Sequence, residues 1–193
     1  MLSVIIPTRD SERALVSTLA VLVPAAMEGF ISEVIVADGG SRDDTAAVAD
    51  VAGCKFSVVE GSLGRRLKTA AAGARAPWLF FLRPGTILDA PWIGEARRFV
   101  EEPSPIASAA TFRRGAPAQP ALREALSLLA AAFGGRPRPE QGLIIAKRFY
   151  EEIGGHAEGA AEPEADLIRR IGRRRIVRLA SIASMVALPQ RDT

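Results

Sequence analysis

The sequence predicts an α/β fold with a mostly parallel central sheet and helices on both of its faces. Short apolar segments rich in Val, Ile and Phe alternate with helical segments of about ten residues, a pattern typical of strand–helix–strand units. Residues 78–82 (WLFFL) are the strongest candidate for a buried strand. The chain has 193 residues, 48% of them apolar and 24% charged, which is enough for one complete core and typical of one globular domain.

The amino-terminal segment reads as strand, helix and strand, followed by an acidic turn. Residues 2–6 form the first expected strand, which Pro7 ends, and Ser11 is the expected N-cap of a helix over residues 12–22. Residues 33–37 (EVIVA) form the second expected strand and lead directly into a turn rich in Asp and Gly. Because open α/β sheets bind ligands at the carboxyl ends of their strands, this turn is the expected ligand site.

The alternation continues along the chain. In the first half we expect helices over residues 43–52, 65–74 and 92–101, and strands over residues 55–59 and 78–82. In the second half we expect an edge or crossing strand over 106–112, strands over 141–146 and 176–179, and helices over 147–153 and 163–171.

Residues 122–133 predict an amphipathic helix with a weak polar face. Leucines and a phenylalanine recur along one face, and most other positions are alanine. We interpret it as a helix that covers the core. The alternatives are contact with a partner subunit, as in a homo-oligomer, or contact with a bilayer surface.

Two motifs in the first half resemble one protein family. Residues 3–8 read SVIIPT and residues 38–45 read DGGSRDDT, and both resemble the family 2 glycosyltransferases, which have the GT-A fold. Residues 141–145 (QGLII) and 153–156 (IGGH) resemble later parts of the same family, so the likeness extends over residues 2–179.

The resemblance implies the organisation and activity of the chain. It implies one Rossmann-like, three-layer GT-A domain over residues 1–193, with a nucleotide-binding half (1–98) and an acceptor-side half (99–193). The implied donor is a nucleotide-diphosphate sugar, and the implied reaction is transfer of the sugar, with inversion, to a hydroxyl group of a lipid or saccharide acceptor.

The nucleotide site is implied at the ends of the first two strands. The matching residues are Pro7, Thr8, Asp10, Asp38 and Gly39. Asp38 is expected to point into the cleft, where its carboxylate would accept hydrogen bonds from the base or the ribose. The alternative is that Asp38 only caps a turn, although Asp43 suits a capping role better because it precedes the next helix.

The sequence departs from the family at the metal motif. The family carries an Asp-x-Asp type motif after the central strand, which binds Mg²⁺ or Mn²⁺, but residues 83–86 here read RPGT. Asp89 is the nearest carboxylate. No metal is therefore firmly predicted. Either Arg83, helped by Arg65 or Arg66, replaces the metal at the diphosphate, or the protein binds without catalysing transfer.

An acidic stretch near the carboxyl end predicts the catalytic acids. Residues 162–167 (EPEADL) resemble the E-D-x-D-L motif of inverting family members. The match places Glu164 at the position of the catalytic base and Asp166 at the final acid. The alternative is that both acids only favour the start of a helix through its dipole.

Composition excludes several classes of site. One cysteine (Cys54) excludes an internal disulfide and a cysteine-based zinc site, which fits the cytosol, and the one histidine (His156) is expected to pack rather than to catalyse. The net charge is +3, with arginines concentrated in residues 169–178. We interpret these arginines as a solvated surface, with an anionic membrane surface or substrate as alternatives. No nucleic-acid motif is present.

Three functions remain open from the sequence. The first is a glycosyltransferase without the usual metal motif, cytoplasmic and with peripheral membrane contact as an option, since no transmembrane segment or signal peptide is expected. The second is a catalytically degenerate GT-A protein that acts as a binding or partner subunit. The third, a nucleotidyltransferase, is weakened because the first loop lacks a glycine-rich phosphate cradle.

Overall fold

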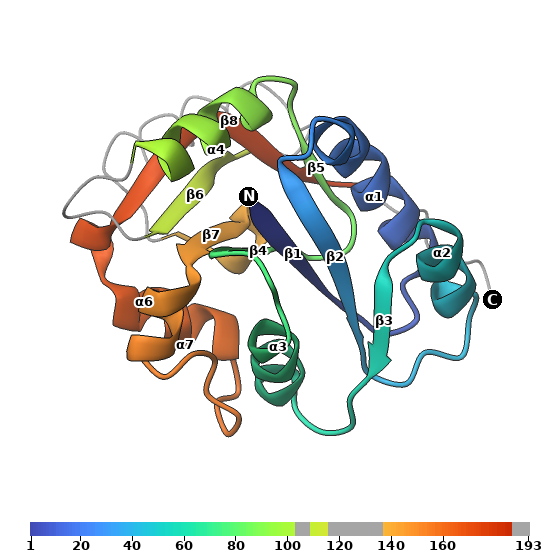
Figure 1. Cartoon of the computed structure of the whole chain (residues 1–193). Helices are drawn as coiled ribbons and strands as arrows, with labels where there is room; N and C mark the ends of the chain where they lie inside the picture. The colour runs from blue at the N-terminus through green and yellow to red at the C-terminus, as the bar shows by residue number, and fades with distance from the viewer. Residues whose placement is uncertain (103–108, 116–136, 187–193) are drawn as a thin grey trace, which may run out of the picture.

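The computed structural model describes residues 1–102, 109–115 and 137–186. One eight-stranded sheet runs through this part of the chain, in the order β3-β2-β1-β4-β7-β6-β8-β5 (Figure 1). Its strands are β1 (Leu2–Thr8), β2 (Ile31–Asp38), β3 (Lys55–Val58), β4 (Trp78–Phe81), β5 (Thr86–Leu88), β6 (Ala109–Arg114), β7 (Leu143–Ala146) and β8 (Ile176–Met185).

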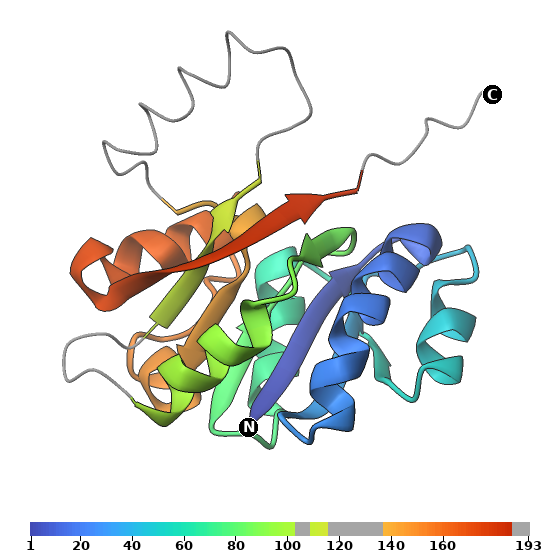
Figure 2. The same cartoon turned by 90° about the horizontal axis from the view of Figure 1, so that it is seen from above.

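The first four strands of that order are parallel. β1 pairs with β2 and with β4, and β3 continues the parallel arrangement beside β2. Beyond β4 the sheet is mixed: β7 is antiparallel to both neighbours, β6 and β8 are parallel, and β5 is antiparallel to β8. Figure 2 shows β8 as a long strand beside β6. The carboxyl ends of β1, β2 and β4 therefore meet at one edge.

Helices cover both faces of the sheet, as the sequence predicts (Figure 1). The α-helices are α1 (Glu12–Met27), α2 (Thr45–Val51), α3 (Leu63–Ala72), α4 (Trp92–Glu101), α6 (Lys147–Glu152) and α7 (Pro163–Ile171), and two 3₁₀ helices are η1 (Pro139–Gln141) and η2 (Arg173–Arg175). Helices α1, α2 and α4 contribute to one apolar core, and α3, α6 and α7 to the other. None of the described helices is long and apolar enough to cross a membrane.

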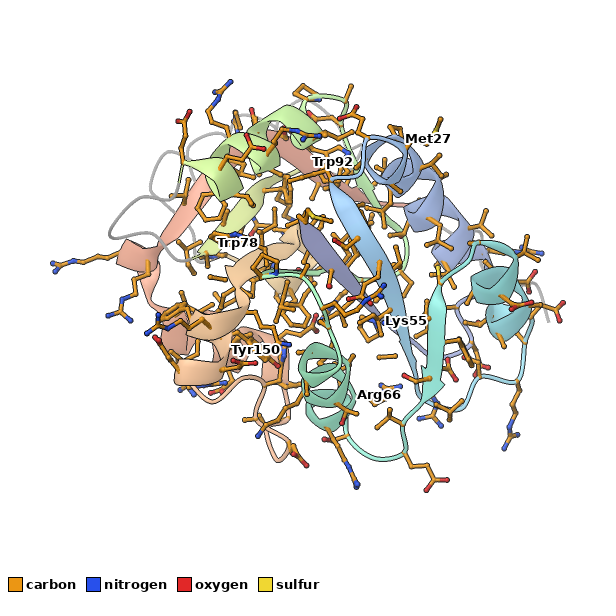
Figure 3. The ribbon with its side chains drawn as sticks, in the orientation of Figure 1. Met27, Lys55, Arg66, Trp78, Trp92 and Tyr150 are labelled. Atoms are coloured by element: carbon orange, nitrogen blue, oxygen red, sulfur yellow. The ribbon has the colours of Figure 1, made fainter. Side chains whose placement is uncertain are left out.

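The alternation of β1 explains the two cores. Val4 and Ile6 face the core of α1 and α4, whereas Ile5 faces the core of α3 and α7. On the first side Trp92 of α4, labelled in Figure 3, is 2% exposed and packs against Phe80 of β4. Burying the helices on both faces of this sheet supplies most of the favourable free energy of folding.

A buried carboxylate ties the start of the sheet together. Glu33 of β2 accepts a hydrogen bond from Ser3, forms salt bridges with Lys55 and Arg75, and also accepts from the Arg75 backbone. Burial alone would raise the pKa of Glu33, but these partners outweigh it and lower the pKa to about 2. The carboxylate therefore stabilises the fold above pH 4.5, and this contribution is lost as the pH falls toward 2.

Several elements differ from the sequence prediction. β5 was not expected, because Pro84-Gly85 reads as a turn and only three residues follow in the strand. β6 lies inside the sheet between β7 and β8 rather than at its edge. The predicted helix over residues 122–133 lies outside the described residues. The division into residues 1–98 and 99–193 stays a prediction.

Ser11 occupies the N-cap position of α1, as predicted, but its side chain does not cap the helix. Its hydroxyl bonds to the backbone of Arg9 and makes no capping bond to α1. Instead, the Asp43 carboxylate accepts from the backbone N–H of Glu12, at 3.1 Å, and from the N–H and hydroxyl of Thr45. Asp43 thus satisfies the starts of two helices at once, because the loop that carries it crosses the start of α1.

His156 is a buried packing residue beneath α6 and α7. It is 1% exposed, its Nδ1 lies 2.9 Å from the Tyr150 hydroxyl, and its ring packs edge-on against Phe81. Burial, followed by the nearby positive charge of Arg170, lowers the pKa of His156 to about 3, and Asp166 opposes this only in part. The ring is therefore neutral in the folded protein near neutral pH.

The buried His156 predicts acid sensitivity. Between pH 6.5 and about 3 the unfolded chain binds a proton that the folded protein does not, so the free energy of unfolding must fall as the pH falls. We expect a loss of about 3 kcal/mol between pH 7 and pH 4. Urea unfolding of His156→Gln at both pH values should show a much smaller loss, because glutamine does not titrate. Equal losses in both proteins would assign the acid sensitivity elsewhere.

Candidate functional site

Two loops form the carboxyl edge at β1 and β2, and hydrogen bonds lock them together. The Asp10 carboxylate accepts from the Arg42 backbone at 2.7 Å, and the Asp10 backbone donates to the Ser41 hydroxyl at 2.8 Å. Asp10 has a φ of +48°, a left-handed conformation that Asp tolerates better than most residues, and these contacts hold it there. Pro7 is buried within β1, opposite Ala37.

Asp38 lies at the centre of these loops. One of its carboxylate oxygens accepts from the Thr8 hydroxyl at 2.7 Å and from the Ser41 hydroxyl at 2.5 Å. The other accepts from the backbone N–H groups of Gly40 and Ser41, at 2.8 and 2.7 Å. Burial alone would raise the pKa of Asp38, but these bonds, those from Ser41 foremost, lower it.

The carboxylate of Asp38 therefore does not project into a cleft. It is 1% exposed, and its four hydrogen bonds use the acceptor positions that a carboxylate offers. In the structure the protein itself uses the acceptor positions of Asp38, and the expected contact of its carboxylate with the base or the ribose stays a prediction. Its geometry is that of an Asx turn that shapes the loop, with Thr8 as a buried brace.

Arg66 lies over Gly39 at the same edge. The Arg66 guanidinium donates to the carbonyl of Thr8 at 3.0 Å, and Figure 3 shows this residue of α3 near the end of β3. A Cβ on Gly39 would lie 1.6 Å from Nη1 of Arg66, so glycine is what allows this close contact. Arg65, by contrast, is exposed and lies over Gly61, away from Gly39.

The Arg66 cation has no carboxylate partner within the described residues. No salt bridge involves it there, and its buried Nε has no hydrogen-bond partner. Burial lowers the pKa of Arg66, and the positive charge of Arg9 adds to this effect while Asp38 opposes it. A partly desolvated cation that forms no salt bridge, and whose nearby negative charge is the buried Asp38, is electrostatically suited to an anionic ligand.

Arg83, at the end of β4, is held between two carboxylates. Its Nε donates to Glu164 at 3.0 Å, its Nη2 also contacts Glu164, and its Nη1 donates to Glu140 at 3.1 Å. The hydrogen bond with Glu164 is the main cause of a raised pKa for Arg83. The structure thus brings the predicted base and the residue at the metal-motif position into direct contact.

A cavity of about 890 Å³ opens beside this ion pair. It lies among the start of α3, the end of β4, the start of α7 and η1, and Leu63, Ile168 and Ile176 supply apolar lining. Arg83, Glu140 and Glu164 lie along the same cavity. Its volume is within the range of small-molecule sites.

The Asp166 carboxylate forms its salt bridges within its own helix. Its carboxylate forms salt bridges with Arg169 and Arg170, which lie one turn later in α7, and these bonds lower its pKa. Arg170 also donates to the carbonyls of Ile153 and Gly155. Asp166 thereby fixes the start of α7 against the preceding loop, and Glu164 is the acid that faces Arg83.

The donor set at the end of β4 does not fit a divalent metal. Among the described residues no three His, Cys, Asp or Glu side chains are grouped so that they could hold one. The Arg83 guanidinium already lies between Glu140 and Glu164, where a second cation would be repelled. Asp89 lies beyond β5, and its carboxylate bonds to the backbone of Ile182 in β8.

Sequence reasoning missed two residues of this site. Ser41 supplies two of the four bonds to Asp38, and an Asp followed three residues later by Ser is a signal for such a turn. Glu140 is the second carboxylate that accepts a hydrogen bond from Arg83. It is 57 positions away in the sequence, and no local pattern connects the two.

Comparisons with known proteins were made for sequence and for structure. No family model and no curated protein matches the sequence. Glucosyl-3-phosphoglycerate synthase from Mycobacterium tuberculosis, solved with Mn²⁺, UDP and glucosyl-3-phosphoglycerate, matches the structure with a TM-score of 0.70 and 18% identity, over 98% of this chain and 73% of that one. The chain has the GT-A fold.

Two other solved structures agree with that result. A mycobacterial protein matches with a TM-score of 0.68 and 22% identity, over 98% of this chain and 68% of that one. The TarS protein of S. aureus, residues 1–349, matches with a TM-score of 0.70 and 17% identity, over 96% of this chain and 60% of that one. At these identities the likeness establishes the GT-A fold, and the chemistry must be argued from the site.

Proposed function

We propose that the protein is a glycosyltransferase that binds a nucleotide-diphosphate sugar at the carboxyl ends of β1, β2 and β4. The observation that carries this proposal is Arg66, a guanidinium without a carboxylate partner among the described residues, seated on Gly39. The structural likeness to a synthase solved with UDP supports the choice of a nucleotide ligand.

The departing diphosphate needs positive charge, and Arg66 supplies it. As the bond between sugar and diphosphate breaks, negative charge builds on the diphosphate oxygens, and fixed donors that face this charge lower the barrier. Guanidinium donates to phosphate bidentately and stays charged at any relevant pH. Arg9 lies close enough to Arg66 to affect its pKa and adds to the same positive field.

The loop residues act by pre-organisation. Thr8, Asp10 and Asp38 use their polar groups to hold the β1–α1 and β2–α2 loops together. A loop that is already ordered loses less entropy when it binds a nucleotide. In this proposal Asp38 determines the shape of the nucleotide site rather than contacting the nucleotide.

Glu164 is the proposed general base. Its carboxylate takes the proton of the acceptor hydroxyl, whose oxygen then bonds to the anomeric carbon of the sugar. The bond from that carbon to the diphosphate breaks, and its electron pair leaves with the diphosphate beside Arg66. A single displacement of this kind inverts the anomeric centre. Arg83 is a positioning residue that fixes the orientation of the Glu164 carboxylate through its hydrogen bonds.

A second function is favoured by the same ion pair. Arg83 is saturated by Glu140 and Glu164, so in this conformation neither acid offers an unpaired charge to a substrate. A GT-A protein that binds a sugar nucleotide without turnover, as a sensor or partner subunit, would have this arrangement. It predicts donor binding with no release of nucleotide diphosphate, whereas the transferase releases it.

Gly39→Ala tests whether the Arg66 guanidinium binds the diphosphate. The new methyl group must displace the far end of the Arg66 side chain, and the backbone at Gly39 needs no left-handed conformation, so the fold is expected to survive. Calorimetric titration should show UDP binding weakened about tenfold, the effect of losing one charged hydrogen bond. Binding of uridine, which has no phosphate, should not change.

Gly159→Ala is the matched control. No atom lies within 4 Å of a Cβ at Gly159, which is exposed in the loop before α7. It should leave UDP binding unchanged. If Gly39→Ala weakens uridine as much as UDP, the substitution disturbs the nucleoside site and the proposed role of Arg66 is wrong.

A further inference from the structure

The cavity beside Arg83 has two electrostatic zones. At its more buried end Glu140 and Glu164 flank Arg83, and the exposed Glu162 also lines the cavity and lies close enough to raise the pKa of Arg83 further. Three carboxylates around one guanidinium leave this zone negative. An anionic group that entered the cavity would therefore be repelled from its inner end.

The outer zone is positive. Arg138 and Arg173 line the cavity, are exposed, and form no salt bridge with any carboxylate of the described residues. Arg138 directly precedes η1, and Arg173 begins η2, which leads into β8. Arg138 and Arg173 thus reach the same cavity from two segments that are distant in the sequence. Arg169 also lines the cavity, but Asp166 neutralises it.

We propose that this cavity binds a phosphate-bearing acceptor, with its phosphate ester held by Arg138 and Arg173. The opposite charges of the two zones orient such a molecule: the phosphate stays at the rim, and the neutral hydroxyl end reaches inward to Glu164. Guanidinium groups recognise phosphate oxygens through paired, charge-assisted hydrogen bonds. The role of the inward hydroxyl rests on the proposed function, whereas the phosphate site does not.

The test measures phosphate binding separately from donor binding. Inorganic phosphate and glycerol 3-phosphate are titrated calorimetrically, with glycerol as the neutral comparator. The protein used in these titrations carries Arg66→Gln, so that phosphate binding at the proposed donor site does not contribute to the measured heat. We expect glycerol 3-phosphate to bind and glycerol not to bind.

The variants assign that binding to the rim. Arg138→Gln combined with Arg173→Gln should weaken glycerol 3-phosphate at least about tenfold, because charge-assisted hydrogen bonds are lost. Arg174→Gln is the matched control for Arg173→Gln alone, which should also weaken binding: each removes one positive charge, but the exposed Arg174 side chain does not line the cavity. Arg174→Gln should change the affinity for glycerol 3-phosphate by no more than about twofold, because a single exposed charge contributes little.

Two results would overturn the proposal. Equal weakening by Arg174→Gln would mean that the arginine run attracts phosphate only through its overall charge. Equal binding of glycerol and glycerol 3-phosphate would mean that the cavity does not recognise phosphate. Either can occur while UDP still binds to the unsubstituted protein, so failure here is distinct from failure of the donor site.

A vesicle-binding experiment distinguishes a lipid acceptor from a soluble one. Vesicles of phosphatidylglycerol in neutral lipid carry the phosphate on a headgroup, and co-flotation measures their binding. Flotation that is lost in the Arg138, Arg173 double variant but kept in Arg174→Gln assigns a lipid acceptor. Binding of glycerol 3-phosphate without flotation assigns a soluble one. Both outcomes support a phosphate site at the rim.

Discussion

Glu164→Gln is expected to reduce sugar transfer by at least about a hundredfold, the usual contribution of a general base. The substitution keeps the size of the side chain and one oxygen that accepts from Arg83, but it removes the basic carboxylate. Donor binding should stay within about twofold, since Arg66 and the β1 and β2 loops are unchanged. The rate of UDP release from a UDP-sugar, with acceptor present, measures the loss.

Glu140→Gln is the matched control for that result. Glu140 is the other carboxylate on Arg83, at 3.1 Å, so this variant also removes one charge from the same guanidinium. Transfer should continue in it, because the base remains. If both variants lose transfer equally, the ion-pair network matters but Glu164 is not the base. Turnover that persists in Glu164→Gln would remove the base role altogether.

Asp38→Ala is expected to abolish nucleotide binding and to destabilise the fold. Four donors lose their acceptor, and Thr8, among them, is 2% exposed, so its hydroxyl is left buried and unsatisfied. We expect a loss of about 2 to 4 kcal/mol in the free energy of unfolding, together with at least a hundredfold weaker binding of UDP. Urea unfolding and calorimetric titration measure the two effects.

Amide hydrogen exchange separates a shaping role from a direct contact. If Asp38 shapes the loop, the N–H groups of Gly40 and Ser41 should exchange much faster in Asp38→Ala. Loss of UDP binding with unchanged exchange would instead show that Asp38 contacts the nucleotide. Asp44→Ala is the control, since Asp44 is exposed in the same loop and makes no capping bond.

Local patterns predicted much of the first half of the fold. The positions of β1, α1, β2 and α4 follow from apolar periodicity, and α4 begins and ends at the predicted residues. However, β1 continues through Pro7, which was expected to end it, and α1 continues past residue 22 to Met27 with Pro24 inside it. β5 escaped because a strand of three residues after a Pro-Gly turn has no periodicity to detect. The GT-A fold itself, predicted from the motifs at residues 3–8 and 38–45, is confirmed by the structural comparisons.

The position of the candidate site was predictable from the sequence, but which of its charged side chains form ion pairs was not. Strand ends placed Asp38 and Arg83 at one edge, because parallel strands end together, whereas Arg66 comes from α3. Which charges neutralise one another depends on contacts between distant segments: Arg83 meets Glu164 across 81 positions. That pairing leaves Arg66 rather than Arg83 as the cation open to a diphosphate, a distinction that composition and spacing do not contain.

Titration of UDP-, GDP- and dTDP-sugars in the presence of EDTA tests the metal-free, arginine-based donor site most directly. We expect at least one of these donors to bind without metal, and its affinity to fall about tenfold in Arg66→Gln. Binding that appears only when Mn²⁺ is added, and that is indifferent to Arg66→Gln, would contradict the proposal.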